Sequence, residues 1–313
     1  MAGLPSKVTD SRRGLGSGVA AYFMWGLFPL FWPLLKPARP LEILAHRFVW
    51  SLLVVLAILA VQRRWDWIPA ILGQPRRLGL LSLAAVCIAT NWGTYIYGVN
   101  SGQVVETSLG YFINPLVTVL LGVVVLQERL RPVQWAALGI GALAVLVLAA
   151  TYGRVPWIAL VLAFSFGTYG LLKKVVSMDS VQSLTVETAV LFLPALGYLV
   201  YIGGGTFTSG SLGHDALLAS SGVVTAIPLL FFGAAASRLP LSTLGLLQYL
   251  APALQFAFGV VIFHEAMPAS RLVGFGLVWV SLVVLTLDGL RHRQDNMSRV
   301  VSRAQAAVAN TAT

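Results

Sequence analysis

Ten stretches of about 20 mostly apolar residues follow one another along this chain, and each is long enough to cross a bilayer as a helix. They cover residues 16–35, 41–61, 78–99, 104–126, 133–151, 155–172, 183–202, 216–236, 241–263 and 269–287. Residues 52–60 and 143–150 are apolar at every position, which excludes the alternating pattern of a membrane β-barrel. Because backbone polar groups in lipid must be satisfied internally, we expect an all-α integral membrane protein with ten transmembrane helices.

The composition agrees with this prediction and excludes several other classes. Hydrophobic residues make up 58% of the 313-residue chain and charged residues 10%, and the mean hydropathy is +0.83. Soluble domains carry roughly 25% charged residues, so a soluble globular domain, a disordered chain and a nucleic-acid-binding domain are excluded. Cys87 is the only cysteine and the phosphate-binding loop motif is absent, so we expect no disulfide within the chain, no metal, no cofactor and no ATPase activity.

The positions of the basic residues predict the orientation. The chain has 21 Lys and Arg against 11 Asp and Glu, which gives a net charge of +10. If the N-terminus is cytoplasmic, 16 basic residues fall in segments on the cytoplasmic side and four on the other side. Basic residues are retained on the cytoplasmic side, so we expect both termini in the cytoplasm and a multi-pass protein of the plasma (inner) membrane.

Several residues recur at one constant spacing. An offset of 137 residues separates Pro115 from Pro252, Glu128 from Glu265, Gly122 from Gly259, and Gly139 from Gly276. We therefore predict two five-helix repeats over residues 16–152 and 153–290, preceded by a cytoplasmic segment at 1–15 and followed by a floppy, polar cytoplasmic tail at 291–313. Because five is odd, the second repeat enters the membrane from the opposite side, which is the inverted topology of many secondary transporters.

Three motifs in the first repeat carry a resemblance to a known family. They are LEILAHR at residues 41–47, SLGYFINPL at residues 108–116 and QERL at residues 127–130. With them the chain, from Gly16 to Leu287, resembles the RarD subgroup of the EamA family, in the drug/metabolite transporter superfamily. The resemblance implies ten helices in two inverted five-helix repeats, cytoplasmic termini, and export of small molecules or metabolites, and it implies no particular substrate.

Polar and aromatic residues near the middle of the predicted helices, with Arg47, are the candidates for a substrate-binding chamber. The set is Trp25, Arg47, Asn91, Tyr95, Tyr111, Asn114, Gln248 and Tyr249. Taken singly, each amide or phenol is better explained by a hydrogen bond between helices. As a set they surround two prolines, Pro115 and Pro252, and a proline weakens a helix by removing one backbone N–H.

Two further expectations concern this chamber. Trp25-Gly26, followed by Phe28-Pro29, adds a weak point in the first helix, and Phe166-Gly167 is its expected counterpart in the sixth. The aromatic residues suit a substrate with an apolar or cationic surface.

Ionisable residues inside the predicted helices need a reason, because each costs about 3 kcal/mol or more in lipid. Arg47 and Glu106 both lie in the outer half of their helices, so we expect an ion pair between them with His46 beside it. The alternatives are that Arg47 extends to the interface and that Glu106 begins its helix. Glu187 occupies a corresponding place in the second repeat. His46, Glu106 and Glu187 are candidates for proton coupling, with a structural role as the equal alternative.

These observations predict a secondary active transporter that exports small organic metabolites or drugs by alternating access. An uncoupled channel or a lipid flippase is the alternative, and a membrane-embedded enzyme is disfavoured because the 11 acidic residues are dispersed. The expected partners are a small-molecule substrate, protons and membrane lipids. The sequence leaves the oligomeric state open, a homodimer included.

Overall fold

The computed structural model describes residues 7–63, 65–127, 129–208, 211–236, 238–239 and 241–311, and these residues form helices joined by short connections. The helices in chain order are α1 (Lys7–Gly26), α2 (Phe28–Phe31), the 3₁₀ turn η1 (Trp32–Leu35), α3 (Pro40–Gln62), α4 (Trp67–Leu72), α5 (Pro75–Asn100), α6 (Val104–Leu126), α7 (Pro132–Tyr152), α8 (Trp157–Val176), α9 (Ser180–Tyr201), α10 (Leu212–Ala236), α11 (Leu241–Leu247), α12 (Leu250–Val261) and α13 (Ala269–Thr311).

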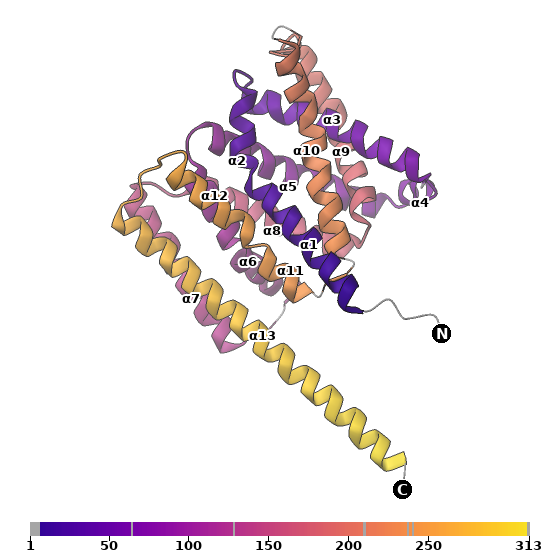
Figure 1. Ribbon diagram of the computed structural model, residues 1–313, viewed down its shortest axis with the longest axis vertical. Helices are drawn as coiled ribbons and strands as arrows, with labels where there is room; N and C mark the ends of the chain where they lie inside the picture. Colours follow the sequence, from indigo (N-terminus) through magenta and orange to yellow (C-terminus); the bar gives the residue numbers. More distant parts are fainter. Residues whose placement is uncertain are drawn as a thin grey trace.

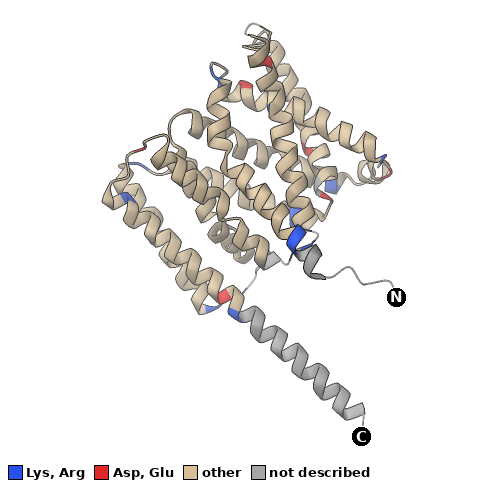
Figure 2. Ribbon diagram, viewed as in Figure 1, with Lys and Arg blue, Asp and Glu red and all other residues tan. Residues whose placement is uncertain are grey.

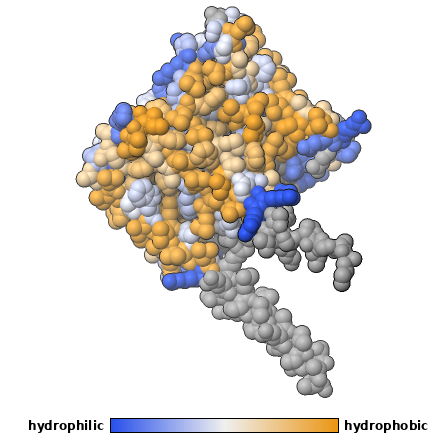
Figure 3. Space-filling view, viewed as in Figure 1, coloured by the Kyte–Doolittle hydropathy of each residue, from blue (hydrophilic) through white to orange (hydrophobic). Residues whose placement is uncertain are grey.

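The prediction of an all-α membrane protein is confirmed. Nine helices in the described residues are long and apolar enough to cross a membrane, and a tenth span results if the segments on either side of a 40° bend at residue 27 are counted together. Charged residues lie mostly toward the helix ends (Figure 2), and hydrophobic side chains cover much of the surface between them (Figure 3). That surface suits the hydrocarbon core of a bilayer.

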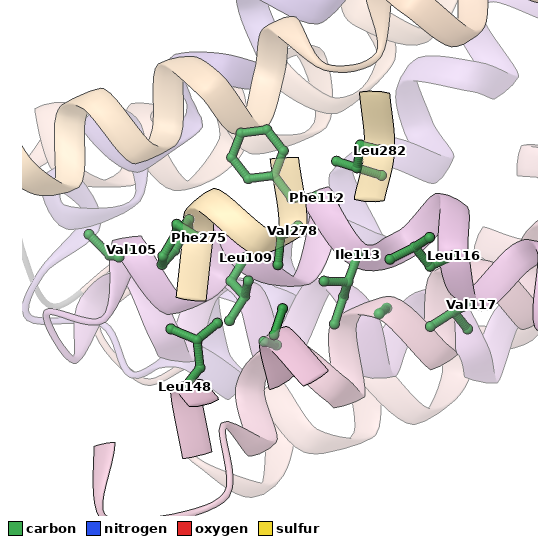
Figure 4. Close-up of a cluster of buried hydrophobic side chains, with 13 residues drawn as sticks. Val105, Leu109, Phe112, Ile113, Leu116, Val117, Leu148, Phe275, Val278 and Leu282 are labelled. Carbon is green, nitrogen blue, oxygen red and sulfur yellow. The ribbon is translucent and has the colours of Figure 1, made fainter. Parts of the chain in front are cut away.

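The largest hydrophobic cluster is built around α6. Leu109, Phe112 and Ile113 of α6 pack against Phe275 and Val278 of α13 (Figure 4). Helices α7 and α13 lie side by side along one edge of the bundle (Figure 1), and Ser281 of α13 donates a hydrogen bond of 2.5 Å to the carbonyl of Ala137 in α7. The cluster therefore fixes α6 between this pair and the rest of the protein.

The helices from the two halves of the chain pack against each other in matching combinations. Helix α1 of the first half packs on α10 of the second half, and α8 of the second half packs on α5 of the first half. Likewise α6 packs on α8, and α12 packs on α1. The pairs α3 with α9, α6 with α12 and α7 with α13 each join equivalent positions of the two halves.

Two features differ from the expectations. The ninth span contains a two-residue turn at 248–249, between α11 and α12, although it still counts as one span, whereas α6 runs through Pro115 without a break. The first span is bent after Gly26, as expected, but α8 continues through Phe166-Gly167. Nearly all of the expected tail at 291–313 lies outside the residues whose side chains are described. Glu128 of the repeat pattern lies outside the described residues.

Candidate substrate cavity

A cavity of about 390 Å³ lies among α1, α3, α5, α6, α8, α10 and α12. Helices from both halves of the chain contribute to its wall, and the wall is mainly apolar with a few polar groups. The lining residues are Tyr22, Trp25, Phe28, Arg47, Ile88, Asn91, Trp92, Tyr95, Tyr111, Asn114, Phe166, Tyr169, Gly170, Lys173, Leu184, Thr225, Leu229, Phe232, Gln248, Ala251, Pro252 and Gln255. Concave sites of this size and character are typical of small-molecule binding.

The structure brings most of the predicted substrate-binding residues to this one cavity. Trp25, Arg47, Asn91, Tyr95, Tyr111, Asn114 and Gln248 line it. Tyr249 does not: it follows Gln248 at the helix break and packs instead against the hydrophobic cluster of α6 and α13.

The helix break in the first span is stabilised from the other half of the chain. Pro29 has no N–H, so it cannot donate to the carbonyl of Trp25, four residues earlier. Gln255 of α12 donates to this carbonyl at 3.1 Å instead. Sequence reasoning missed Gln255, although a glutamine three residues after Pro252 inside an apolar span was a usable signal.

Asn91 joins three helices at the cavity wall. Its side-chain amide donates to the carbonyl of Leu162 at 3.0 Å and to the hydroxyl of Ser165 at 3.2 Å, and it accepts from the Tyr111 hydroxyl at 3.0 Å. These bonds connect α5, α6 and α8. Asn91 therefore holds the wall together, which is the interhelical role that a single amide in a span favours.

The predicted Arg47–Glu106 ion pair is wrong. Arg47 lies beside the cavity, where its Nε donates to the hydroxyl of Thr225 at 2.8 Å and its guanidinium carbon lies 3.7 Å from the centroid of the Trp92 ring. Glu106 begins α6 next to the start of α8. There it pairs with Arg154 at 2.6 Å and accepts from the N–H of Ile158 at 3.1 Å. The loop before α8 brings Arg154 closer to Glu106 than Arg47 can come.

Glu187 has a different surrounding from Glu106. It is fully buried in α9, pairs with Lys173 Nζ at 3.1 Å and accepts from the hydroxyls of Ser183 at 2.6 Å and Tyr169 at 3.0 Å. Lys173 and Tyr169 line the cavity, so Glu187 contacts two of its wall residues. The sequence counted Lys173 only as a cytoplasmic anchor, because it stands beside Lys174 at the end of a span.

His46 lies away from the cavity wall. It is 4% exposed, and its ring centroid lies 5.0 Å from that of Phe207, in the connection between α9 and α10. Beside this connection Glu42 accepts from the N–H of Thr206 at 2.6 Å and from its hydroxyl at 2.7 Å. His46 therefore lies beneath a loop that is tied to the beginning of α3.

Glu265, the second glutamate of the repeat pattern, lies in the connection between α12 and α13. It accepts hydrogen bonds from the N–H groups of Val104 and Val105, the latter at 3.0 Å, at the start of α6. Burial raises the pKa of the Glu265 carboxyl, while these N–H groups and the charge of Arg271 oppose the shift. A carboxylate at a helix N-terminus satisfies free N–H groups and suits the helix dipole.

These features define a multi-pass membrane protein whose two halves enclose a central cavity. A model of the EamA-like transporter family matches residues 12–150. Protein RarD of Streptomyces exfoliatus is 59% identical over 97% of this chain and 97% of its own length. The uncharacterized transporter YojE of Bacillus subtilis is 40% identical over 92% of this chain and 98% of its own length. Protein RarD of Escherichia coli is 38% identical over 90% of this chain and 96% of its own length.

The chain therefore belongs to the EamA-like transporter family, within its RarD group, and it is a membrane transporter. The resemblance seen in the three motifs of the first half is confirmed. A solved crystal structure is similar to this chain with a TM-score of 0.57 and 20% sequence identity. The alignment covers 89% of this chain and 98% of the solved chain, and this similarity supports the fold only.

Proposed function

We propose that this protein is a secondary active transporter of the plasma membrane that exports small organic molecules by alternating access, with both termini in the cytoplasm. The observation that carries the proposal is the cavity of about 390 Å³, whose wall is built from both halves of the chain and adjoins the bend between α1 and α2 and the two-residue turn between α11 and α12. Discontinuous helices at the interface of two halves are a recurrent feature of transporter sites.

The matching packing of the two halves supports an inverted repeat. Gly167 of α8 packs against Val117 of α6, and Gly26 of α1 packs against Leu254 of α12. Val117 and Leu254 are separated by the same 137 residues as the paired prolines. Two inverted halves with equivalent contacts have two packings of similar free energy, which is what alternating access requires.

The exposure of the wall residues suggests which face is open. We call the face where α1 begins the N-terminal face. The wall residues far from the N-terminal face are at most 3% exposed, namely Arg47, Asn91 and Tyr95. The side chain of Lys173, near the end of α8 at the N-terminal face, is 22% exposed. In the proposed cycle, a structure with its opening at the N-terminal face is the state open toward the cytoplasm.

Glu187 is the proposed proton-coupling residue. Of the three candidates, Glu106 is held by Arg154 and the start of α8, and His46 lies outside the cavity wall. Glu187 alone contacts two wall residues, Lys173 and Tyr169. Protonation of Glu187 would remove the charge that holds Lys173, so the ammonium group would become available to the cavity and the local packing would change.

The test is transport by the purified protein in proteoliposomes. Export of radiolabelled metabolites and drugs, screened as a panel, should be saturable and should respond to a pH step across the membrane. Flux that never saturates would replace the carrier with a channel, lipid scrambling would indicate a flippase, and product formation would indicate an enzyme.

Coupling is tested with Glu187→Gln. This variant should lose the response to the pH step while it still exchanges labelled for unlabelled substrate, because exchange needs no net proton movement. Asp66→Asn is the matched control, since Asp66 is exposed in the connection before α4 and makes no side-chain cap. A Glu187→Gln protein with the wild-type response would remove Glu187 from the coupling role.

A further inference from the structure

Within the part of the chain that the structure describes, Arg47 is a buried cation without an acidic partner. It is 3% exposed and lies in the wall of the cavity. The ion pairs between described residues use Arg131, Arg154 and Lys173, so no described carboxylate lies within 4.0 Å of the Arg47 guanidinium. Only its Nε has a hydrogen-bond partner among the described residues, the hydroxyl of Thr225. The two terminal nitrogens, which form the fork that binds anions, remain available.

Aromatic rings surround this guanidinium and partly stabilise it. Its central carbon lies 3.7 Å from the ring centroid of Trp92, 5.0 Å from that of Trp32 and 5.6 Å from that of Phe28. Such cation–π contacts reduce the cost of burial. They leave the positive charge in place, however, and a buried charge normally has an opposite charge beside it.

The rest of the cavity wall supplies no compensating charge. Among the described lining residues the charged ones are Arg47 and Lys173, and neither Asp nor Glu occurs. Lys173 is paired with Glu187 immediately behind the wall. The hydroxyl of Tyr95, another lining residue, has no hydrogen-bond partner among the described residues, but it is buried in the wall. The cavity thus carries one unbalanced positive charge.

The remaining wall is suited to an apolar body. Trp25, Phe166 and Phe232 present aromatic rings to the same cavity, whose volume of about 390 Å³ lies in the range of small-molecule sites. A complementary ligand therefore combines one anionic group with an aromatic or aliphatic part. A cationic ligand, which the aromatic residues alone had suggested, would meet the positive charge of Arg47.

We propose that the cavity binds small organic anions, a carboxylate on an aromatic or aliphatic body, and that Arg47 binds the carboxylate. The proposal rests on the proposed transport function and names its substrate class. A planar guanidinium with two free nitrogens matches a carboxylate by two parallel hydrogen bonds, and such charge-assisted pairs are the stronger ones. Thr225 holds the Nε so that the fork keeps one orientation.

The experiment measures binding to the full-length protein in neutral detergent by isothermal titration and thermal shift. The probes are benzoate, 3-phenylpropanoate and indole-3-acetate, each with its methyl ester and with an amine of the same aromatic body. We expect at least one carboxylate to bind about tenfold or more tightly than its ester and amine, because only the carboxylate can use the guanidinium. A ligand that binds the folded state also raises the melting temperature.

Two substitutions assign this preference to Arg47. Arg47→Gln should bring the carboxylate and its ester to equal affinity, and Arg47→Lys should keep part of the preference, since the charge stays but the planar fork is lost. Arg129→Gln, on the exposed connection between α6 and α7, is the control and should leave all affinities unchanged. If Arg47→Gln does not fold, the wild-type probe series and Arg47→Lys still decide the question.

The proposal is overturned if the esters or amines bind as tightly as the carboxylates, if no carboxylate binds, or if Arg47→Gln keeps the preference. Competition by phosphatidylglycerol, compared with phosphatidylcholine, would instead assign the arginine to a lipid headgroup and overturn the soluble substrate. Transport is judged separately in proteoliposomes. If carboxylates bind but never cross the membrane, the anion site is supported and the transporter proposal is overturned. If only neutral or cationic probes are transported, the transporter proposal is supported and the anion site is overturned.

Discussion

Two helix contacts occupy corresponding places in the two halves, α6 with α8 and α12 with α1, and they are built differently. At the first, Gly110 lets the backbones approach so closely that an added Cβ would lie 2.9 Å from the carbonyl oxygen of Ala159. At the second, the atoms facing Gly26 belong to the side chain of Leu254. Close backbone approach at small residues is the main source of helix association in membranes.

The polar groups at the two contacts differ as well. The α6–α8 contact has the Glu106–Arg154 ion pair and a carboxylate bond to the start of α8. At the other contact, the position 137 residues after Glu106 is Thr243. There the first span is bent, and Gln255 bonds to a carbonyl that a proline has freed. The same repeat thus gives one contact that locks two continuous helices and one that joins a bent first span to a span with a two-residue turn beside the cavity.

The largest expected effect comes from filling the closer contact. Gly110→Ala places a methyl group 2.7 Å from the Cβ of Leu162 and against the backbone of Ala159, and neither can move without moving α8. We expect a loss of about 3 kcal/mol in the free energy of unfolding, the upper end for overpacking. Gly26→Ala should cost less, about 2 kcal/mol, because a new rotamer of Leu254 relieves the contact with its Cδ1 at 2.6 Å and leaves the contact with its Cβ at 2.9 Å. Thermal unfolding in detergent measures both.

Gly139→Ala in the middle of α7 is the control for these two variants. An added Cβ at Gly139 meets nothing within 4 Å, and alanine is the better helix former, so this variant should be as stable as the parent or slightly more so. Equal losses for Gly110→Ala and Gly26→Ala would show that the two contacts do not differ in rigidity.

The second largest effect on stability is expected at the Glu106–Arg154 ion pair of the α6–α8 contact. Glu106→Gln keeps the shape of the side chain but removes the charge that faces Arg154 and the start of α8. We expect a loss of about 2 kcal/mol in stability, the usual contribution of hydrogen bonds to a charged group, with some reduction because Arg154 is 40% exposed. Thr243→Val, the corresponding change at the other contact, should leave the melting temperature nearly unchanged. A large effect of Thr243→Val would mean that the second contact also depends on a polar lock.

Much of this fold could be predicted from the sequence, because its strongest signals are lengths and periodicities. The span expected at 104–126 coincides with α6, and that at 133–151 differs from α7 by one residue at each end. The prolines at 115 and 252 were visible too. The effect of each proline on its helix was not visible, because it depends on how the surrounding helices accommodate the freed backbone groups. The structure shows a regular α6 through Pro115 and a two-residue turn before Pro252, between α11 and α12.

The cavity wall was predictable in its residue types but less so in its pairings. Polar residues in the middle of spans, such as Asn91 and Asn114, stand out in an apolar sequence, and the structure places them around one space. The partner of Arg47 could not be inferred, since it depends on which helix faces α3. Thr225 lies 178 residues away and belongs to α10. Arg154 looked like a loop residue outside the membrane, so its bond to Glu106 was not foreseen.

The smallest expected effect sharpens the comparison at the bent contact. Gln255→Leu keeps a side chain of similar size but removes the donor to the half-buried carbonyl of Trp25. We expect a loss of about 1 kcal/mol in stability, the typical cost of one neutral hydrogen bond. Pro29→Ala in the same protein should recover part of this loss, because the alanine N–H can donate to that carbonyl within the helix. Thermal unfolding of the single and double variants measures this coupling. Strict additivity would show that the glutamine does not act by satisfying the freed carbonyl, and the bend at α1 would then need another explanation.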